Sequence, residues 1–170
     1  QLTLGDVAGF LRFSSAEHPG LDAAVRADLA APDRLAALLE AANRSTLDGL
    51  RSFLVELPEV ADPLVDALAA PGATGRLLAG GLQRDITDIP NFLEFVRVSA
   101  PKLLAPLLEH LATNEAVADL AQTVQQLMPS AAAKFLHFAC VDLPEVAKVL
   151  AARLAEPDVV RTMTEAAMSR

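Results

Sequence analysis

Four prolines recur at nearly constant spacing along this chain, and each is followed ten residues later by a leucine. The prolines are Pro19, Pro58, Pro101 and Pro144, and the leucines are Leu29, Leu68, Leu111 and Leu154. The steps between successive prolines are 39, 43 and 43 residues, which indicates a period of 43 with a four-residue deletion between the first two units. A unit of this size cannot bury its own apolar face, so neighbouring units must stack into one continuous core.

Each unit contains three predicted helices. The second helix follows the proline and has apolar residues at steps of four, as at Val60, Leu64 and Leu68. The first helix is marked by aromatic residues, as at Phe92 and Phe95. The third helix begins at a proline or asparagine that has the same position in each unit and is well suited to the first turn of a helix. These residues are Pro32, Pro71, Asn114 and Pro157.

The sequence therefore predicts an all-α fold of twelve helices and no strand, in a single helical repeat domain over residues 1–170. The predicted helices cover 6–17, 20–31, 33–43, 46–56, 59–69, 73–83, 89–99, 102–113, 115–127, 130–141, 145–155 and 158–168. The four repeat units extend approximately over 6–44, 45–84, 88–128 and 130–170. The paired Gly80 and Gly81 interrupt the third helix of the second unit, and we expect them to allow close packing on a neighbouring helix rather than to form a hinge.

A short first helix, two longer helices and a period near 43 resemble the architecture of the armadillo and HEAT superfamily of helical repeats. The resemblance covers essentially the whole chain. It implies a right-handed α-solenoid of four three-helix repeats, in which the third helices line a concave face. A globular helical bundle of the same twelve helices is the alternative.

Charge and composition restrict the function classes. The net charge of −8, from 22 acidic and 14 basic residues, repels phosphate backbones and anionic lipid, so we expect no nucleic acid or membrane partner. Charges or prolines interrupt every hydrophobic stretch before it could span a bilayer, which predicts a soluble protein. A single cysteine favours a cytoplasmic location, although secretion as an effector into a host cell stays open, and the alanine-rich composition suits a bacterial source.

Cys140 is the one residue for which chemistry needs consideration. It follows His137 by three helical positions, which is acceptable metal-ligand spacing, but two ligands do not make a site, and we expect no metal and no cofactor. Cys140, Val141 and Asp142 resemble the Cys-X-Asp triplet that carries the nucleophile in a class of bacterial ubiquitin ligases, which implies a cysteine-dependent enzyme as an alternative function. We expect instead that Cys140 is a partly buried structural thiol and that the protein is not an enzyme.

The outward positions of the third helices form the predicted partner-binding face. Amide side chains are abundant there and can bond the backbone of an extended peptide, which favours a protein or peptide ligand over a merely solvated face. The predicted residues are Arg76, Gln83, Asp119, Gln122, Gln125, Gln126, Arg161 and Glu165. Neither end of the chain has a distinctly polar capping helix, so self-association through uncapped ends is a further expectation. The sequence thus predicts an interaction scaffold or adaptor, for which a place within a larger bacterial regulator or effector stays open, with a self-assembling structural module as another alternative.

Overall fold

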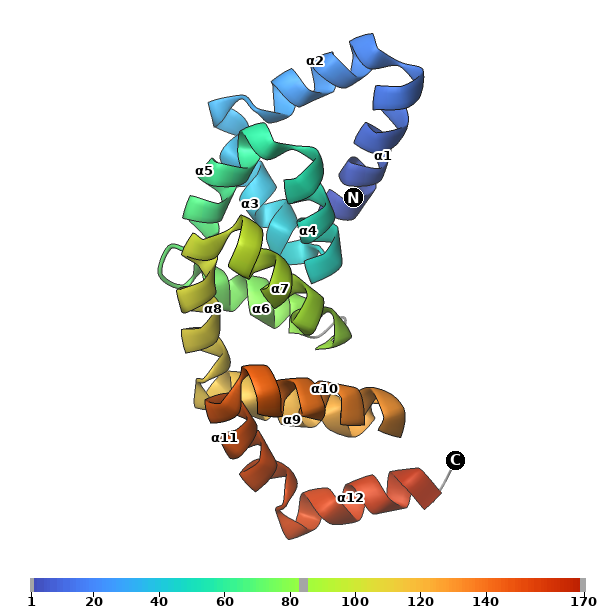
Figure 1. Ribbon diagram of the computed structural model, residues 1–170, viewed down its shortest axis with the longest axis vertical. Coiled ribbons are helices and arrows are strands. Elements are labelled where there is room, and N and C mark those ends of the chain that lie inside the picture. Colours follow the sequence, from blue (N-terminus) through green and yellow to red (C-terminus); the bar gives the residue numbers. More distant parts are fainter. Residues whose placement is uncertain (1, 83–85, 169–170) are drawn as a thin grey trace. The chain divides into compact units, whose positions relative to one another are not determined.

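The computed structural model describes residues 2–82 and 86–168, and these residues form helices and short connections without any strand (Figure 1). The all-α prediction and the twelve helices are confirmed. The α-helices are α1 (Leu4–Glu17), α2 (Pro19–Leu29), α3 (Leu35–Arg44), α4 (Leu47–Glu56), α5 (Pro58–Leu68), α6 (Ala73–Leu82), α7 (Ile89–Ser99), α8 (Leu104–Leu111), α9 (Asn114–Gln126), α10 (Pro129–Asp142), α11 (Pro144–Leu154) and α12 (Pro157–Met168). Three 3-10 turns join them: η1 (Pro32–Arg34), η2 (Ile86–Asp88) and η3 (Pro101–Leu103).

The first backbone N–H groups of a helix have no partner within it, and the helices begin at residues that either lack this N–H or accept a hydrogen bond from it. Helices α2, α5 and α11 start at the recurring prolines, whose missing N–H is unneeded in the first turn. The hydroxyls of Thr3, Thr46 and Thr113 accept hydrogen bonds from backbone N–H groups at the starts of α1, α4 and α9. The backbone N–H and hydroxyl of Thr3 also donate to the carboxylate of Asp6, which lowers the pKa of that carboxyl. The ionised carboxylate of Asp6 therefore contributes stability that is fully present above the ordinary pKa of aspartate and is lost as the pH falls through the lowered pKa.

The chain divides into two compact units, Gln1–Leu107 and Leu108–Arg170, with the boundary inside α8. In the first unit, first helices of successive predicted repeats pack on one another, α1 on α4 and α4 on α7. Third helix α3 packs on third helix α6 and also on α5, the second helix of the next repeat. The second unit has the same kinds of contact, α9 with α12 and α9 with α11.

The apolar stripe of the second helices forms the centre of the core. Val60, Leu64 and Leu68 of α5 are buried, as are Val146 and Leu150 of α11. The equivalent positions in the third repeat, Leu103, Leu107 and Leu111, are buried as well. Helix α2 differs, since none of its residues is buried and Leu21 is 49% exposed. The predicted stripe is therefore buried in every predicted repeat except the first.

A polar network holds α2 in place of apolar burial. The buried hydroxyl of Ser14 in α1 donates to Asp22 Oδ1 at 3.1 Å, and Arg26 Nε donates to Asp22 Oδ2 at 2.7 Å. Arg26 Nη1 also donates to the backbone carbonyl of Glu56 at the end of α4. Asp22 and Arg26 thus connect α2 to α1 and to the end of α4.

Glycines allow two close helix contacts in the first unit. Gly5 of α1 faces Gly49 of α4, and a Cβ built on Gly5 would lie 3.3 Å from the Gly49 Cα. A Cβ on Gly80 of α6 would lie only 2.3 Å from the backbone carbonyl oxygen of Asn43 in α3. The prediction that Gly80 packs closely on a neighbouring helix is confirmed, because no side chain fits between these two backbones.

The same substitution at two helical glycines should have opposite effects on stability. Gly80→Ala should lower the free energy of unfolding by about 1–3 kcal/mol, because α6 must move away from Asn43. Gly9→Ala in α1 is the matched control: no atom lies within 4 Å of its built Cβ, so the gain in helix propensity should raise stability by about 0.5–1 kcal/mol. Urea unfolding of both variants measures the difference. A Gly80→Ala protein as stable as Gly9→Ala would contradict the close contact of α3 and α6.

Candidate functional site

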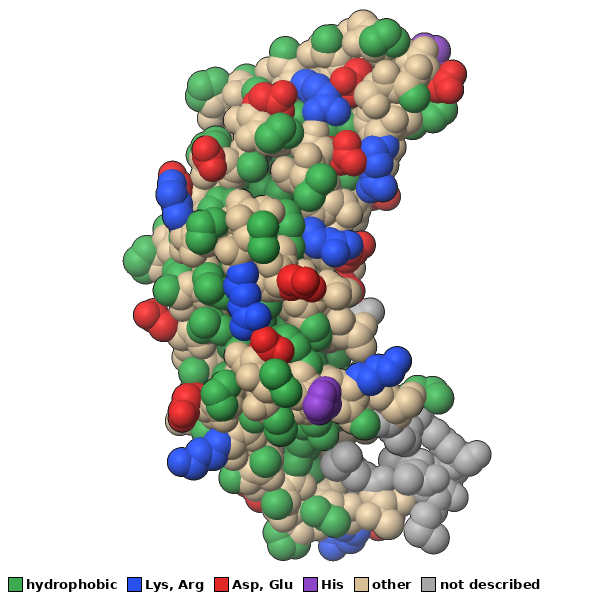
Figure 2. All heavy atoms as spheres, viewed as in Figure 1, with side chains coloured by type: hydrophobic (Ala, Val, Ile, Leu, Met, Phe, Trp, Pro, Cys, Tyr) green, Lys and Arg blue, Asp and Glu red, His purple; other side chains and the backbone are tan. Residues whose placement is uncertain are grey.

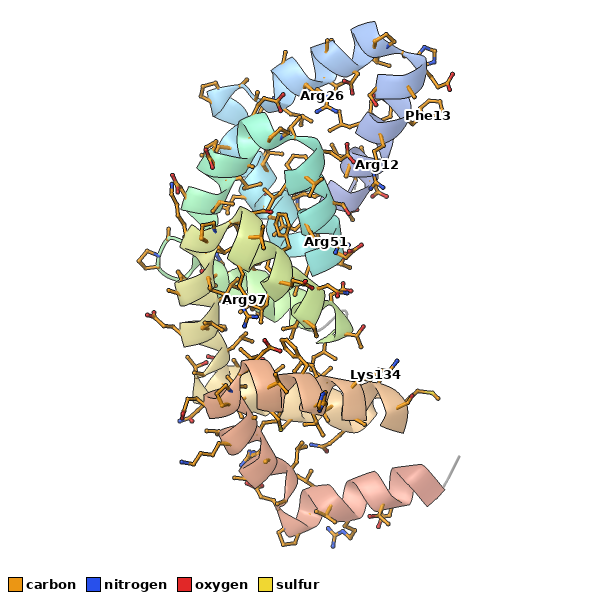
Figure 3. The ribbon with its side chains drawn as sticks, in the orientation of Figure 1. Arg12, Phe13, Arg26, Arg51, Arg97 and Lys134 are labelled. Atoms are coloured by element: carbon orange, nitrogen blue, oxygen red, sulfur yellow. The ribbon has the colours of Figure 1, made fainter. Side chains whose placement is uncertain are left out.

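A groove of about 410 Å³ lies on an exposed face of the first helices in the first unit. Helices α4 and α7 form most of it, and Arg12 of α1 lines one part. Figure 3 shows Arg12 on α1 and Arg51 on α4. On the face of this unit seen in Figure 2, charged side chains of both signs lie among hydrophobic ones. The groove is open to solvent and combines apolar with charged lining residues.

The apolar part of the groove is formed by Val55, Phe95 and Val98. Val55 is 61% exposed and Val98 is 81% exposed, whereas Phe95 is half-buried. Val141 on α10 occupies the same repeat position, 43 residues after Val98, and is 66% exposed. Valine thus recurs in three successive repeats at a position that faces solvent, where burial in the core cannot account for it.

The charged part of the groove contains one ion pair between helices and one acid without a partner. Arg12 Nε of α1 lies 3.1 Å from Glu56 Oε1 of α4, and Arg51 pairs with Asp48 within α4. Glu94 of α7 is exposed and, among the described residues, has no ion pair or hydrogen bond through its side chain. The two arginines are therefore already neutralised locally, and the free charge in the groove is negative.

The predicted third-helix residues lie on three helices in the two units. Arg76 is exposed on α6 of the first unit. In the second unit, Asp119, Gln122 and Gln126 are exposed and Gln125 is half-buried on α9, while Arg161 and Glu165 are exposed on α12; Gln83 lies outside the described residues. Because α9 packs on α12, the structure brings these six residues of the second unit onto two adjacent helices. Arg161 Nη2 donates to Asp158 Oδ1 at 2.9 Å.

The prediction that Cys140 is a partly buried thiol is wrong, because Cys140 is exposed. Ala132, Phe135 and Ala139 of α10 are buried, as is Leu143 directly after the helix. Cys140 is the residue after Ala139 and does not belong to this buried stripe. In the part of the chain that the structure describes, no group of three or more His, Cys, Asp or Glu residues could hold a metal ion.

The groove residues are not among the predicted site residues, although the sequence contains a signal for them. Val55, Val98 and Val141 recur at intervals of 43 and lie outside the apolar stripe of their helices, so a repeated apolar residue on the polar side could have indicated a binding surface.

Comparison of this chain with protein-family models, with curated proteins and with solved structures gives no match. None of the described helices combines the length and the apolar character required to cross a membrane.

The exposure of Cys140 predicts a thiol that reacts in the folded state. One thiol per chain should react with a small disulfide reagent without denaturant, and Cys140→Ser should change the free energy of unfolding by less than about 0.5 kcal/mol. Absorbance of the released thiolate and urea unfolding measure these two results. Reaction only after denaturation would contradict the exposed position of Cys140.

Proposed function

We propose that this chain is a non-enzymatic interaction scaffold that binds a polypeptide segment of a partner protein in the groove of its first helices. The single observation that carries this proposal is the exposure of Val55 and Val98 within a charged groove. The proposal includes a solenoid of four three-helix repeats similar to armadillo and HEAT proteins, and it is supported by the packing of like helices within each unit. A cytoplasmic location is part of the proposal and is supported by the single cysteine.

The apolar side chains give a partner its affinity. Covering Val55 and Val98 would remove apolar area from water, which is favourable by about 25 cal/mol for each Å² buried. The side chains of α4 and α7 also leave a depression between these two helices, and the ridge of side chains on a helix from the partner fits such a depression. The partner segment we propose is therefore a short amphipathic helix.

The charged side chains specify which amphipathic helix binds. Glu94 has no ion pair within the described residues, while Arg12 and Arg51 already have acidic partners. A lysine or arginine beside the apolar stripe of the partner would pair with Glu94, and the net charge of −8 would attract a basic segment at long range. The proposed ligand is an amphipathic helix with apolar residues on one face and a basic residue at its edge.

The amide-rich third helices are a second candidate surface for the same function. Gln122 and Gln126 of α9 are exposed, and Arg161 of α12 is exposed on the helix that packs on α9. This surface supports binding of an extended peptide through backbone hydrogen bonds, as the sequence predicts. The two surfaces make different demands on the ligand and respond to different substitutions.

Peptides selected by the protein from a random display library should distinguish the surfaces. We expect selected peptides to have apolar residues at helical spacing next to lysine or arginine, and Val55→Glu with Val98→Glu should weaken their binding at least about tenfold, which is about 1.4 kcal/mol. The comparison variant combines Gln122→Ala, Gln125→Ala and Arg161→Ala. Calorimetric titration of each protein with the same synthetic peptide gives the dissociation constants.

The outcomes separate the alternatives. Loss of binding in the valine variant alone supports the groove, and loss in the triple variant alone moves the binding site to the third helices. Equal binding by all three proteins would contradict both surfaces. Selected peptides that are acidic would contradict the role of Glu94.

A further inference from the structure

A small cavity lies in the first unit between the end of α2, the start of α3 and the first turns of α5. Its volume is about 200 Å³, which is below the roughly 300–1,000 Å³ of pockets for small-molecule ligands and suits a single side chain. Its lining is mostly apolar and includes Leu29, Leu35, Val60 and Pro63. Glu59 is the charged residue among those that line the cavity.

The same depression occurs in the second unit. There a cavity of about 350 Å³ lies between α9 and α11, and three of its lining residues are Asn114, Val117 and Val149. With the period of 43 and the four-residue deletion, these residues correspond to Pro32, Leu35 and Pro63, which line the cavity of the first unit. Both cavities therefore belong to the contact between a third helix and the second helix of the next predicted repeat, not to the exposed face of α2.

Glu59 supplies two hydrogen-bond acceptors to the cavity of the first unit. Its carboxylate is exposed and has no ion pair with any residue that the structure describes. Its backbone carbonyl is directed along α5 towards the residue four positions later, which is Pro63 and has no N–H to donate. Glu59 and Pro63 both line the cavity, so this carbonyl lies in its wall. In α11 the residue equivalent to Pro63 is Val149, whose N–H can form the helical hydrogen bond.

The surroundings of this cavity favour a cation. The cavity reaches the C-terminal end of α2, which is the negative end of the helix dipole, and none of its lining residues is basic. The arginines in this region are already paired, Arg26 with Asp22 at 2.7 Å and Arg34 with Asp28 at 2.8 Å. The hydrogen bond with Asp22 is the main cause of the raised pKa of Arg26, and the charge of Glu59 contributes less.

We propose that this cavity binds the side chain of a lysine from a partner polypeptide. The methylene groups of the lysine would lie against Leu35 and Val60, and its ammonium group would donate hydrogen bonds to the carboxylate and the carbonyl of Glu59. Lysine suits this site because its compact ammonium has three donors for two separate acceptors, whereas the planar guanidinium of arginine suits one carboxylate. The site is separate from the groove of the first helices and does not depend on the function of that groove.

The cavity of the second unit provides an internal comparison. Arg153 and Glu156 line it and form an ion pair at 2.9 Å. An ammonium group in that cavity would meet the positive charge of Arg153, which opposes binding. We therefore expect lysine to bind in the cavity of the first unit and not in that of the second.

Titration with n-butylammonium, which is the lysine side chain without its backbone, tests the proposal. The methyl NMR signals of Leu35 and Val60 should shift to saturation in the millimolar range, while those of Val117 and Val149 should stay unchanged. Butan-1-ol has the same length without the charge and should bind about threefold to fivefold more weakly. Sodium chloride at the same concentrations controls for ionic strength.

Two further probes test the identity of the occupant. n-Propylguanidinium, the arginine side chain, should bind more weakly than n-butylammonium. Nα-acetyl-lysine N-methylamide contains lysine within a peptide backbone and should bind at least as tightly as n-butylammonium. Tighter binding of the guanidinium would overturn the assignment to lysine, and weaker binding of the peptide-like lysine would overturn the assignment to a polypeptide.

Three variants test the residues of the site. Glu59→Gln should weaken the binding of n-butylammonium about threefold to fivefold, because the charge is lost. Glu145→Gln is the matched control, since Glu145 is the equivalent exposed residue of α11 and lines neither cavity. Pro63→Val introduces the residue that α11 has at this position, restores the N–H, and should weaken binding at least about twofold.

The variant positions are exposed, so each variant should keep the helical content and melting temperature of the unmodified chain. Absence of saturable shifts at Leu35 and Val60, equal shifts in the cavity of the second unit, or unchanged binding by Glu59→Gln would each overturn the proposal. Unchanged binding by Pro63→Val would overturn the role of the Glu59 carbonyl.

Discussion

The fold depends on one constraint: the apolar stripes of α5 and α11 are buried because a neighbouring helix packs on each of them, α3 on α5 and α9 on α11. Where that neighbour exists, as for Val60 and Leu64 in α5 or Val146 and Leu150 in α11, the stripe is buried. In α2 no residue is buried, and hydrogen bonds among Ser14, Asp22 and Arg26 hold this helix against α1. Apolar burial is favourable in proportion to area, so the covered helices contribute far more to stability than α2 does.

The close glycine contacts determine where the first and third helices lie in the first unit. Gly5 against Gly49 brings α1 onto α4, and Gly80 against the Asn43 backbone brings α6 onto α3. A buried hydrogen bond adds to these contacts: the hydroxyl of Ser45 accepts it from the backbone N–H of Leu4 at 2.9 Å. Close packing of the first helices is what places Arg12 beside Glu56 and forms the groove next to Val55.

Much of the helical framework could be predicted from the sequence, because prolines mark helix starts and apolar residues at steps of four mark buried faces. Boundaries were less predictable: Pro101 opens a 3-10 turn, so α8 begins at Leu104 rather than near residue 102. The groove could not be derived in the same way, since the pairing of Arg12 with Glu56 joins residues of two helices through tertiary packing. The exposure of Cys140 was mispredicted because one helical position separates it from the buried Ala139.

Hydrogen exchange tests most directly whether the covering helices α3 and α9 stabilise α5 and α11. Backbone amides in the centres of α5 and α11 should exchange at least about a hundredfold more slowly than those of α2, since opening α2 exposes no buried apolar side chain. Equal protection of α2, α5 and α11 would contradict the account, because it would mean that the stability of these helices does not depend on burial of their apolar side chains.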